Sequence, residues 1–123
     1  MTDHLAATLD KVRTYAVESA AGRWPELCHV LGDWLPRPTD PQIALPLATA
    51  VAVGAELDDA IPFAAAWALV CFSVRVLDDC ADQDNPRALH LQLGIPRAGN
   101  LGTGGLLHAG RRSPIVDLSL TYR

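Results

Sequence analysis

The chain has 123 residues, half of them hydrophobic, and a formal net charge of −4 from 14 acidic and 10 basic residues. This composition excludes a collagen-like chain and a disordered acidic tail, and the length suffices for one domain with a modest core. Because no basic patch stands out, the sequence predicts no nucleic-acid partner. The three cysteines follow no repeated spacing and the N-terminus shows no secretory signal, so we expect a cytoplasmic protein without disulfides.

Hydrophobic residues recur with helical spacing from the N-terminus onward. The first predicted helix starts at Thr2 or Asp3 and ends before Gly22, which stands where a helix-terminating glycine is expected. A short second helix starts at Pro25 and ends at Gly32. The spacing of the apolar residues places one set on a single face of the first helix: Leu5, Leu9, Val12, Ala16 and Ala20.

Three prolines in residues 34–41 predict a loop, after which Asp40 and Pro41 cap and start a third helix that ends at Gly54. A fourth helix, opened by Asp58 and Asp59, is apolar on nearly every face through residue 77. A helix that is hydrophobic all round belongs in the middle of a bundle. Since no segment alternates with a period of two residues, the predicted fold class is all-α, a partial helical bundle.

The apolar runs 43–55 and 61–74 are the two segments that could enter a membrane. Each is shorter than the roughly 18–20 residues that span a bilayer, and Pro46 and Pro62 interrupt them. We therefore interpret both runs as buried core helices, in preference to a membrane hairpin, and predict no transmembrane segment.

Beyond Pro86 the helical pattern weakens. Residues 87–93 allow two helical turns, but residues 94–110 contain six glycines, each of which costs about 1 kcal/mol relative to alanine in a helix. The segment 99–105 lacks the Lys-Ser/Thr of a phosphate-binding loop and is interpreted as a plain flexible loop. We therefore predict a helical domain over residues 1–110 and an irregular tail over 111–123.

The strongest functional feature is a run of aspartates directly after the most apolar helix, at Asp78, Asp79, Asp82 and Asp84. Aspartate is a weak helix former, and negative charge at a helix C-terminus opposes the helix dipole. Asp78 and Asp82 are four residues apart and share a helix face, with Asp79 on the flank. Such a cluster suits Mg²⁺, which completes its shell with water and phosphate oxygens. The alternative interpretation is a solvated helix end with turn-forming residues.

Two arginines lie near the aspartates. Arg75 is three residues before Asp78 and four before Asp79, so it can pair with either, and Arg87 presents a planar fork suited to a diphosphate. EF-hand and zinc patterns are missing around the cluster. The histidines and tryptophans are interpreted as structural, and the neighbouring acid is expected to raise the pKa of the Cys80 thiol, which argues against a nucleophile.

An apolar helix that ends in Asp78-Asp79-x-x-Asp82 resembles the first aspartate-rich motif of the trans-isoprenyl diphosphate synthases, the polyprenyl synthetase family. Ala64-Ala65-Ala66 leads into the motif in the family manner, and Arg87 stands where the family places the first of two arginines. Residues 94–98 look like the start of the next family helix. The resemblance covers about residues 40–108, and only the aspartate motif is specific within it.

The resemblance implies the N-terminal part of the isoprenoid synthase fold and a prenyltransferase of isoprenoid biosynthesis. Asp78, Asp79 and Asp82 would bind Mg²⁺ that bridges to an allylic isoprenoid diphosphate, which then ionises. Arg87 and Arg37 would bind the substrate diphosphate groups. A fragment of a class I terpene cyclase is implied equally, and no further catalytic residue is identified.

The chain also departs from the family pattern. Ala88 replaces the second arginine, Leu77 stands where the family often has histidine, and residues 35–40 leave only Arg37 of a Gly-Gly-Lys-Arg segment. The second aspartate-rich motif is missing, so we expect a truncated protein that is inactive by itself. The competing hypothesis is a non-catalytic helical interaction module or regulatory subunit, which docks or forms a homodimer through exposed apolar helices.

Overall fold

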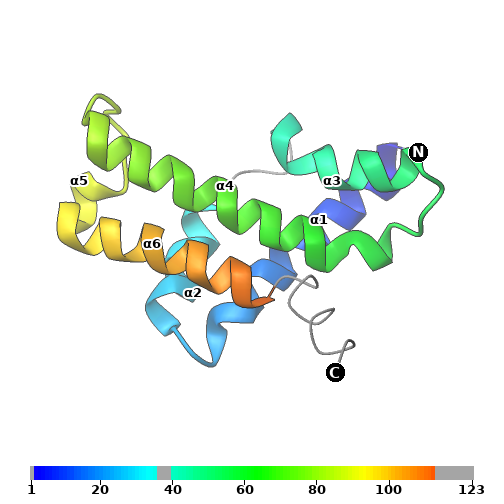
Figure 1. Ribbon diagram of the computed structural model, residues 1–123, viewed down its shortest axis with the longest axis horizontal. Coiled ribbons are helices and arrows are strands. Elements are labelled where there is room, and N and C mark those ends of the chain that lie inside the picture. Colours follow the sequence, from blue (N-terminus) through cyan, green and yellow to red (C-terminus); the bar gives the residue numbers. More distant parts are fainter. Residues whose placement is uncertain (1, 36–39, 113–123) are drawn as a thin grey trace, which may run out of the picture.

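The computed structural model describes residues 2–35 and 40–112, and every regular element within them is helical (Figure 1). This confirms the all-α fold class. The elements in chain order are α1 (Thr2–Ala21), α2 (Pro25–Trp34), α3 (Pro41–Ala52), the 3₁₀ turn η1 (Asp58–Ala60), α4 (Ile61–Asp82), α5 (His90–Leu93) and α6 (Ile95–Arg112).

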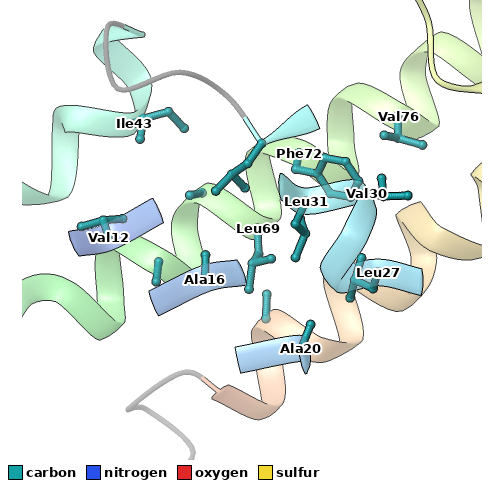
Figure 2. Packing of buried hydrophobic residues seen from close by; sticks show 14 of the residues in the cluster. Val12, Ala16, Ala20, Leu27, Val30, Leu31, Ile43, Leu69, Phe72 and Val76 are labelled. Atoms are coloured by element: carbon teal, nitrogen blue, oxygen red, sulfur yellow. The ribbon is translucent and has the colours of Figure 1, made fainter. Parts of the chain in front are cut away.

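Helix α4 runs through the middle of the molecule, with α6 antiparallel beside it and with α1 and α3 also packed on it. Figure 2 shows side chains of α1 and α2 directed toward Leu69 and Phe72 of α4. The predicted inner face of the first helix is largely confirmed, because its last four apolar positions are buried and Leu5 is partly buried. The residues that share the core include Val12, Ala16, Ala20, Leu27, Leu31, Leu47, Leu69 and Phe72.

The N-terminus of α3 has the predicted cap. Asp40 precedes the helix in an extended conformation, and its Oδ1 accepts a hydrogen bond of 3.0 Å from the backbone N–H of Gln42. Pro41 occupies the first helical position, where its missing N–H leaves no bond unmade. This cap fixes the end of α3 that lies near the aspartate-bearing part of α4.

Helix α4 is central, as predicted, but it is not buried all round. Its inner face includes Ala68 and Phe72, whereas Phe63, Trp67 and Val74 remain 45%, 39% and 46% exposed. The stretch Asp58–Asp82 is the one candidate among the described residues that is long and apolar enough to cross a bilayer. The core helix of a soluble protein meets the same criterion, and 39% of the apolar window is buried inside this protein.

The glycine-rich segment 99–105 forms the middle of α6, so its interpretation as a flexible loop is wrong. Three of its glycines stand where α6 approaches other side chains closely. A Cβ atom at Gly102 would lie 2.9 Å from Leu77 Cγ, while one at Gly104 or Gly105 would overlap Trp24 or Ser73. Tertiary packing therefore offsets the helix-propensity cost of glycine, about 1 kcal/mol per residue.

The helix expected to start within residues 94–98 is present, since α6 begins at Ile95. It continues through Arg112, and so into the predicted tail, of which residues 113–123 lie outside the described part of the chain. Before α6, the predicted two turns over residues 87–93 reduce to the single-turn helix α5 (His90–Leu93). The turn after α4 and the short helix α5 reverse the chain direction, so that α6 packs alongside α4.

Candidate functional site

All three motif aspartates lie in the last two turns of α4, because the helix continues beyond residue 77 to Asp82. Gln83 caps the helix: its φ of 54° is left-handed, and its N–H donates to the carbonyl of Asp79 at 2.9 Å. The left-handed residue completes the final turn in the way a terminal glycine commonly does. The aspartates are therefore held on regular helix, with fixed spacing.

The helical spacing brings Asp78, Asp79 and Asp82 to one cavity of about 540 Å³. The cavity lies along α4, and its polar wall also includes Arg75 and, from α3, Gln42. The remaining lining residues are apolar or weakly polar side chains of α4: Trp67, Val70, Cys71 and Val74. Val70, Cys71 and Val74 precede the aspartates on α4 and line the same cavity.

Arg75 pairs with neither Asp78 nor Asp79 but with Asp40. Its Nη2 lies 3.4 Å from Asp40 Oδ2, so the pair links α4 to the N-terminus of α3. The Arg75 side chain is 55% exposed, and such pairs contribute little stability. Asp78 and Asp82 have no ion-pair partner among the described residues, so the carboxylate end of the cavity is left strongly negative.

Asp79 differs from the other two aspartates because it also faces a second, smaller cavity of about 210 Å³ that includes Arg87. Asn85 Nδ2 donates to Asp79 Oδ2 at 3.2 Å, and Asn85 Oδ1 accepts from the backbone N–H of Arg87 at 3.0 Å. Asn85 therefore fixes the turn that carries Arg87 relative to the end of α4. Sequence reasoning does not identify Asn85 as a site residue, because its position before Pro86 indicates only a turn.

The carboxylates suit a Mg²⁺ site that water and phosphate oxygens complete, rather than a site made entirely of protein ligands. Within residues 2–35 and 40–112, no group of three or more His, Cys, Asp or Glu side chains is placed to hold a metal ion. A cage built entirely of protein ligands is therefore not formed. Asp78 and Asp82 line the same cavity one turn apart, which suits an ion that takes one or two carboxylates and completes its shell with water and phosphate oxygens.

The two cysteines near the site are poor nucleophiles. Burial raises the pKa of the Cys80 thiol, and the Asp79 carboxylate raises it further, so the predicted direction is confirmed with burial as the larger cause. Burial and then Asp40 raise the pKa of Cys71, which the Arg75 guanidinium partly offsets. Neither sulfur carries the thiolate that nucleophilic chemistry needs near neutral pH.

The remaining sequence-predicted positions lie in different surroundings. Arg37 lies outside the described residues. Arg87 is exposed at the smaller cavity, and His90 is buried three residues further on, with no hydrogen-bond partner for Nδ1 among the described residues. Trp67 combines packing with a place in the cavity wall, where its indole N–H donates to the Gln42 carbonyl at 2.7 Å. Sequence reasoning misses Gln42, because nothing in the local pattern places α3 beside α4.

No protein-family model, curated protein or solved structure matches the chain. The resemblance to the polyprenyl synthetase family therefore rests on the residues of the motif.

Proposed function

We propose that the chain is an isoprenyl diphosphate synthase-like protein whose larger cavity binds an allylic isoprenoid diphosphate together with Mg²⁺. The observation that carries this proposal is the composition of the cavity, which joins three carboxylates to an apolar wall on one helix. A diphosphate and its hydrocarbon need these two surfaces side by side. The closeness of the carboxylates on a stable helix also favours this interpretation over a solvated helix end.

The order of residues along α4 indicates that the hydrocarbon chain of the ligand would extend from the aspartates toward the N-terminus of the helix. Val74 precedes Asp78 by one turn, and Val70 and Trp67 follow at further steps of helical spacing toward the N-terminus of α4. A neighbouring, mainly apolar cavity of about 460 Å³ shares Trp67 and Val70 with the cavity that contains the aspartates, and it extends to Phe63. The apolar surface thus continues along the helix from the carboxylates, as a prenyl chain requires.

The negative charge of the site means that a diphosphate can bind there only together with Mg²⁺. Three carboxylates repel a diphosphate, and two unit charges 4 Å apart interact by about 4 kcal/mol at an effective dielectric constant of 20. Asp78 and Asp82 would hold Mg²⁺, which when bound supplies the Lewis acid that stabilises a diphosphate leaving group. Arg87, and Arg37 from outside the described residues, would bind diphosphate oxygens.

Isothermal titration calorimetry with dimethylallyl diphosphate tests the proposal. We expect binding in the presence of Mg²⁺ and none when the metal is removed with EDTA. Asp78→Asn and Asp82→Asn remove one charge each with little change of shape, and either should abolish the Mg²⁺-dependent binding. Asp84→Asn is the matched control, because Asp84 belongs to the same acidic run but lies outside the cavity.

Two results would contradict the proposal. Binding that persists in both the Asp78 and Asp82 variants would show that the carboxylates do not hold the cation. Binding that is equal with and without Mg²⁺ would show that the diphosphate is recognised elsewhere on the protein.

A second candidate function, a helical interaction module, is favoured by the exposed apolar side chains around α4. Phe63 and Trp67 of α4 are 45% and 39% exposed, and Leu45 of the neighbouring helix α3 is 56% exposed. Exposed apolar patches often mark interfaces. Sedimentation of the full chain tests this function. Self-association that Phe63→Gln abolishes and Leu91→Gln, at an exposed position of α5, leaves intact would support it, whereas a monomer at all concentrations would oppose a homodimer.

A further inference from the structure

A separate cavity of about 420 Å³ lies where the turn between α1 and α2 meets the C-terminal half of α6. It shares no lining residue with the cavity that contains the aspartates. Its lining residues are Arg23, Trp24, Gly104, Leu107, His108 and Arg111. The function proposed above uses none of these residues.

The charge of this cavity is opposite to that of the whole chain. The chain has a net charge of −4, yet the titratable lining residues are two arginines and a histidine, with no acidic side chain among them. The side chains of Arg23 and Arg111 have no hydrogen bond or ion pair within the described part of the chain. By contrast, Arg13 bonds to backbone carbonyls, Arg75 pairs with Asp40, and Arg97 pairs with Glu26. Two arginines whose side chains have no partner among the described residues therefore line one cavity.

The wall between these arginines is built by tertiary contacts. A side chain at Gly104 would overlap the six-membered ring of Trp24, so the glycine lets the indole lie against α6. His108 Nε2 lies 2.9 Å from Ser19 Oγ, which holds the imidazole to α1. Trp24 and Leu107 then provide apolar surface beside the cationic groups.

We propose that this cavity binds a small phosphorylated molecule. The phosphoryl group lies between the guanidinium groups of Arg23 and Arg111, and the organic part contacts Trp24 and Leu107. Planar guanidinium groups bind phosphate through paired, charge-assisted hydrogen bonds. Binding needs no Mg²⁺, because the site supplies its own positive charge. It is therefore independent of the function proposed for the aspartates.

Nuclear magnetic resonance of the full chain, in buffer without divalent cations, tests the proposal with inorganic phosphate as the probe. The three tryptophans give separate indole N–H signals, and Trp24→Phe assigns the one from the cavity. We expect phosphate to shift the Trp24 signal with saturation and to leave the Trp67 signal in place. Asp78→Asn should not change the phosphate affinity, which separates this test from that of the proposed function.

Arginine variants identify the ligands. Arg23→Gln and Arg111→Gln should each weaken phosphate binding about tenfold or more, because each removes charge-assisted hydrogen bonds. Arg97→Gln, which breaks an exposed pair elsewhere, should leave the affinity unchanged. Arg23→Lys and Arg111→Lys retain the charge next to the ends of α1 and α6, so they preserve folding while losing the paired geometry, and they too should weaken binding.

Two results would overturn the proposal. One is a Trp24 shift that sodium chloride reproduces at equal ionic strength, which would reduce the effect to charge screening. The other is unchanged phosphate affinity in the glutamine variants together with a lower melting temperature. That result would assign the arginines to the carbonyl ends of α1 and α6, where cations stabilise a helix.

Discussion

The two faces of α4 have similar hydrophobicity and different surroundings. One face packs against α1, α2 and α6, and its Phe72 is 2% exposed. The other face carries Phe63 at 45% exposure and leads toward Asp78 at the C-terminal end of the helix. The same residue type is therefore core on one side and surface on the other. Hydrophobicity alone does not decide burial, because burial needs a complementary surface on a neighbouring element.

The difference has a structural cause in the residues that meet each face. Gly102 and Gly105 of α6 let that helix lie close to α4, and α4 contributes small residues such as Ala65 and Ala68 to the core. The open face has large side chains and adjoins the cavities that contain Trp67 and Val70. The closed face stabilises the fold, while the open face is free for a ligand.

The largest expected effect is on the free energy of unfolding when one phenylalanine on each face of α4 is truncated. Phe72→Ala should reduce the free energy of unfolding by about 3–5 kcal/mol, since it leaves a cavity in the core. Phe63→Ala should reduce it by less than about 1 kcal/mol, because the ring is already half exposed. Urea unfolding measures both values. Equal losses in the two variants would show that the open face is covered in solution.

The next effect tests the contact between α4 and α6. Gly105→Ala places a Cβ atom against Ser73 Oγ, so it should lower the free energy of unfolding by about 1–2 kcal/mol, despite the gain in helix propensity. Ser73 Oγ is buried and has no hydrogen-bond partner within the described residues. Ser73→Ala should therefore be tolerated or stabilising.

The double variant makes this test specific. In the Ser73→Ala background the new Cβ atom at position 105 would be 3.6 Å from the Cβ atom of residue 73, an ordinary contact distance. Gly105→Ala should then stop being destabilising, and a double-mutant cycle measures the coupling between the two positions. Additive effects of the two substitutions would disprove the close contact.

A smaller effect of opposite sign is expected at Gly99, which lies in the same helix but has no neighbouring atom within 4 Å of the position that a Cβ atom would take. Gly99→Ala should raise the free energy of unfolding by about 1 kcal/mol, because only helix propensity changes. Thermal unfolding monitored by circular dichroism measures it. A loss of stability would mean that α6 is not a regular helix at this position.

The smallest effect concerns the pKa of Cys80 at the open end of α4. Asp79→Asn removes the weaker of the two causes that raise this pKa, so the thiolate should form at lower pH. Alkylation of Cys80 at mildly alkaline pH, followed by peptide mass spectrometry, should then be faster by less than about tenfold, because burial remains. Asp82→Asn serves as the control, and an equal acceleration there would contradict the assignment to Asp79.

Sequence reasoning succeeds where the signal is local. Helical periodicity and proline placement predict the first four helices, and Asp40 caps α3 as expected. The same reasoning fails at residues 99–105, because helix propensity disfavours the glycines and the reason for them lies in distant residues such as Trp24 and Ser73. It also assigns Arg75 to the nearby aspartates, whereas Asp40, 35 residues away, binds it.

The sequence by itself determined the helical class and the alignment of Asp78 with Asp82, since spacing of four residues on a helix fixes a shared face. Only the tertiary structure decided which face of α4 is open, where Asn85 holds Asp79, and that Arg23 and Arg111 meet at one cavity. The physical reason is that the two kinds of interaction act over different separations along the sequence. Periodicity and capping act within a few residues, while packing and charge pairing depend on segments that only folding brings together.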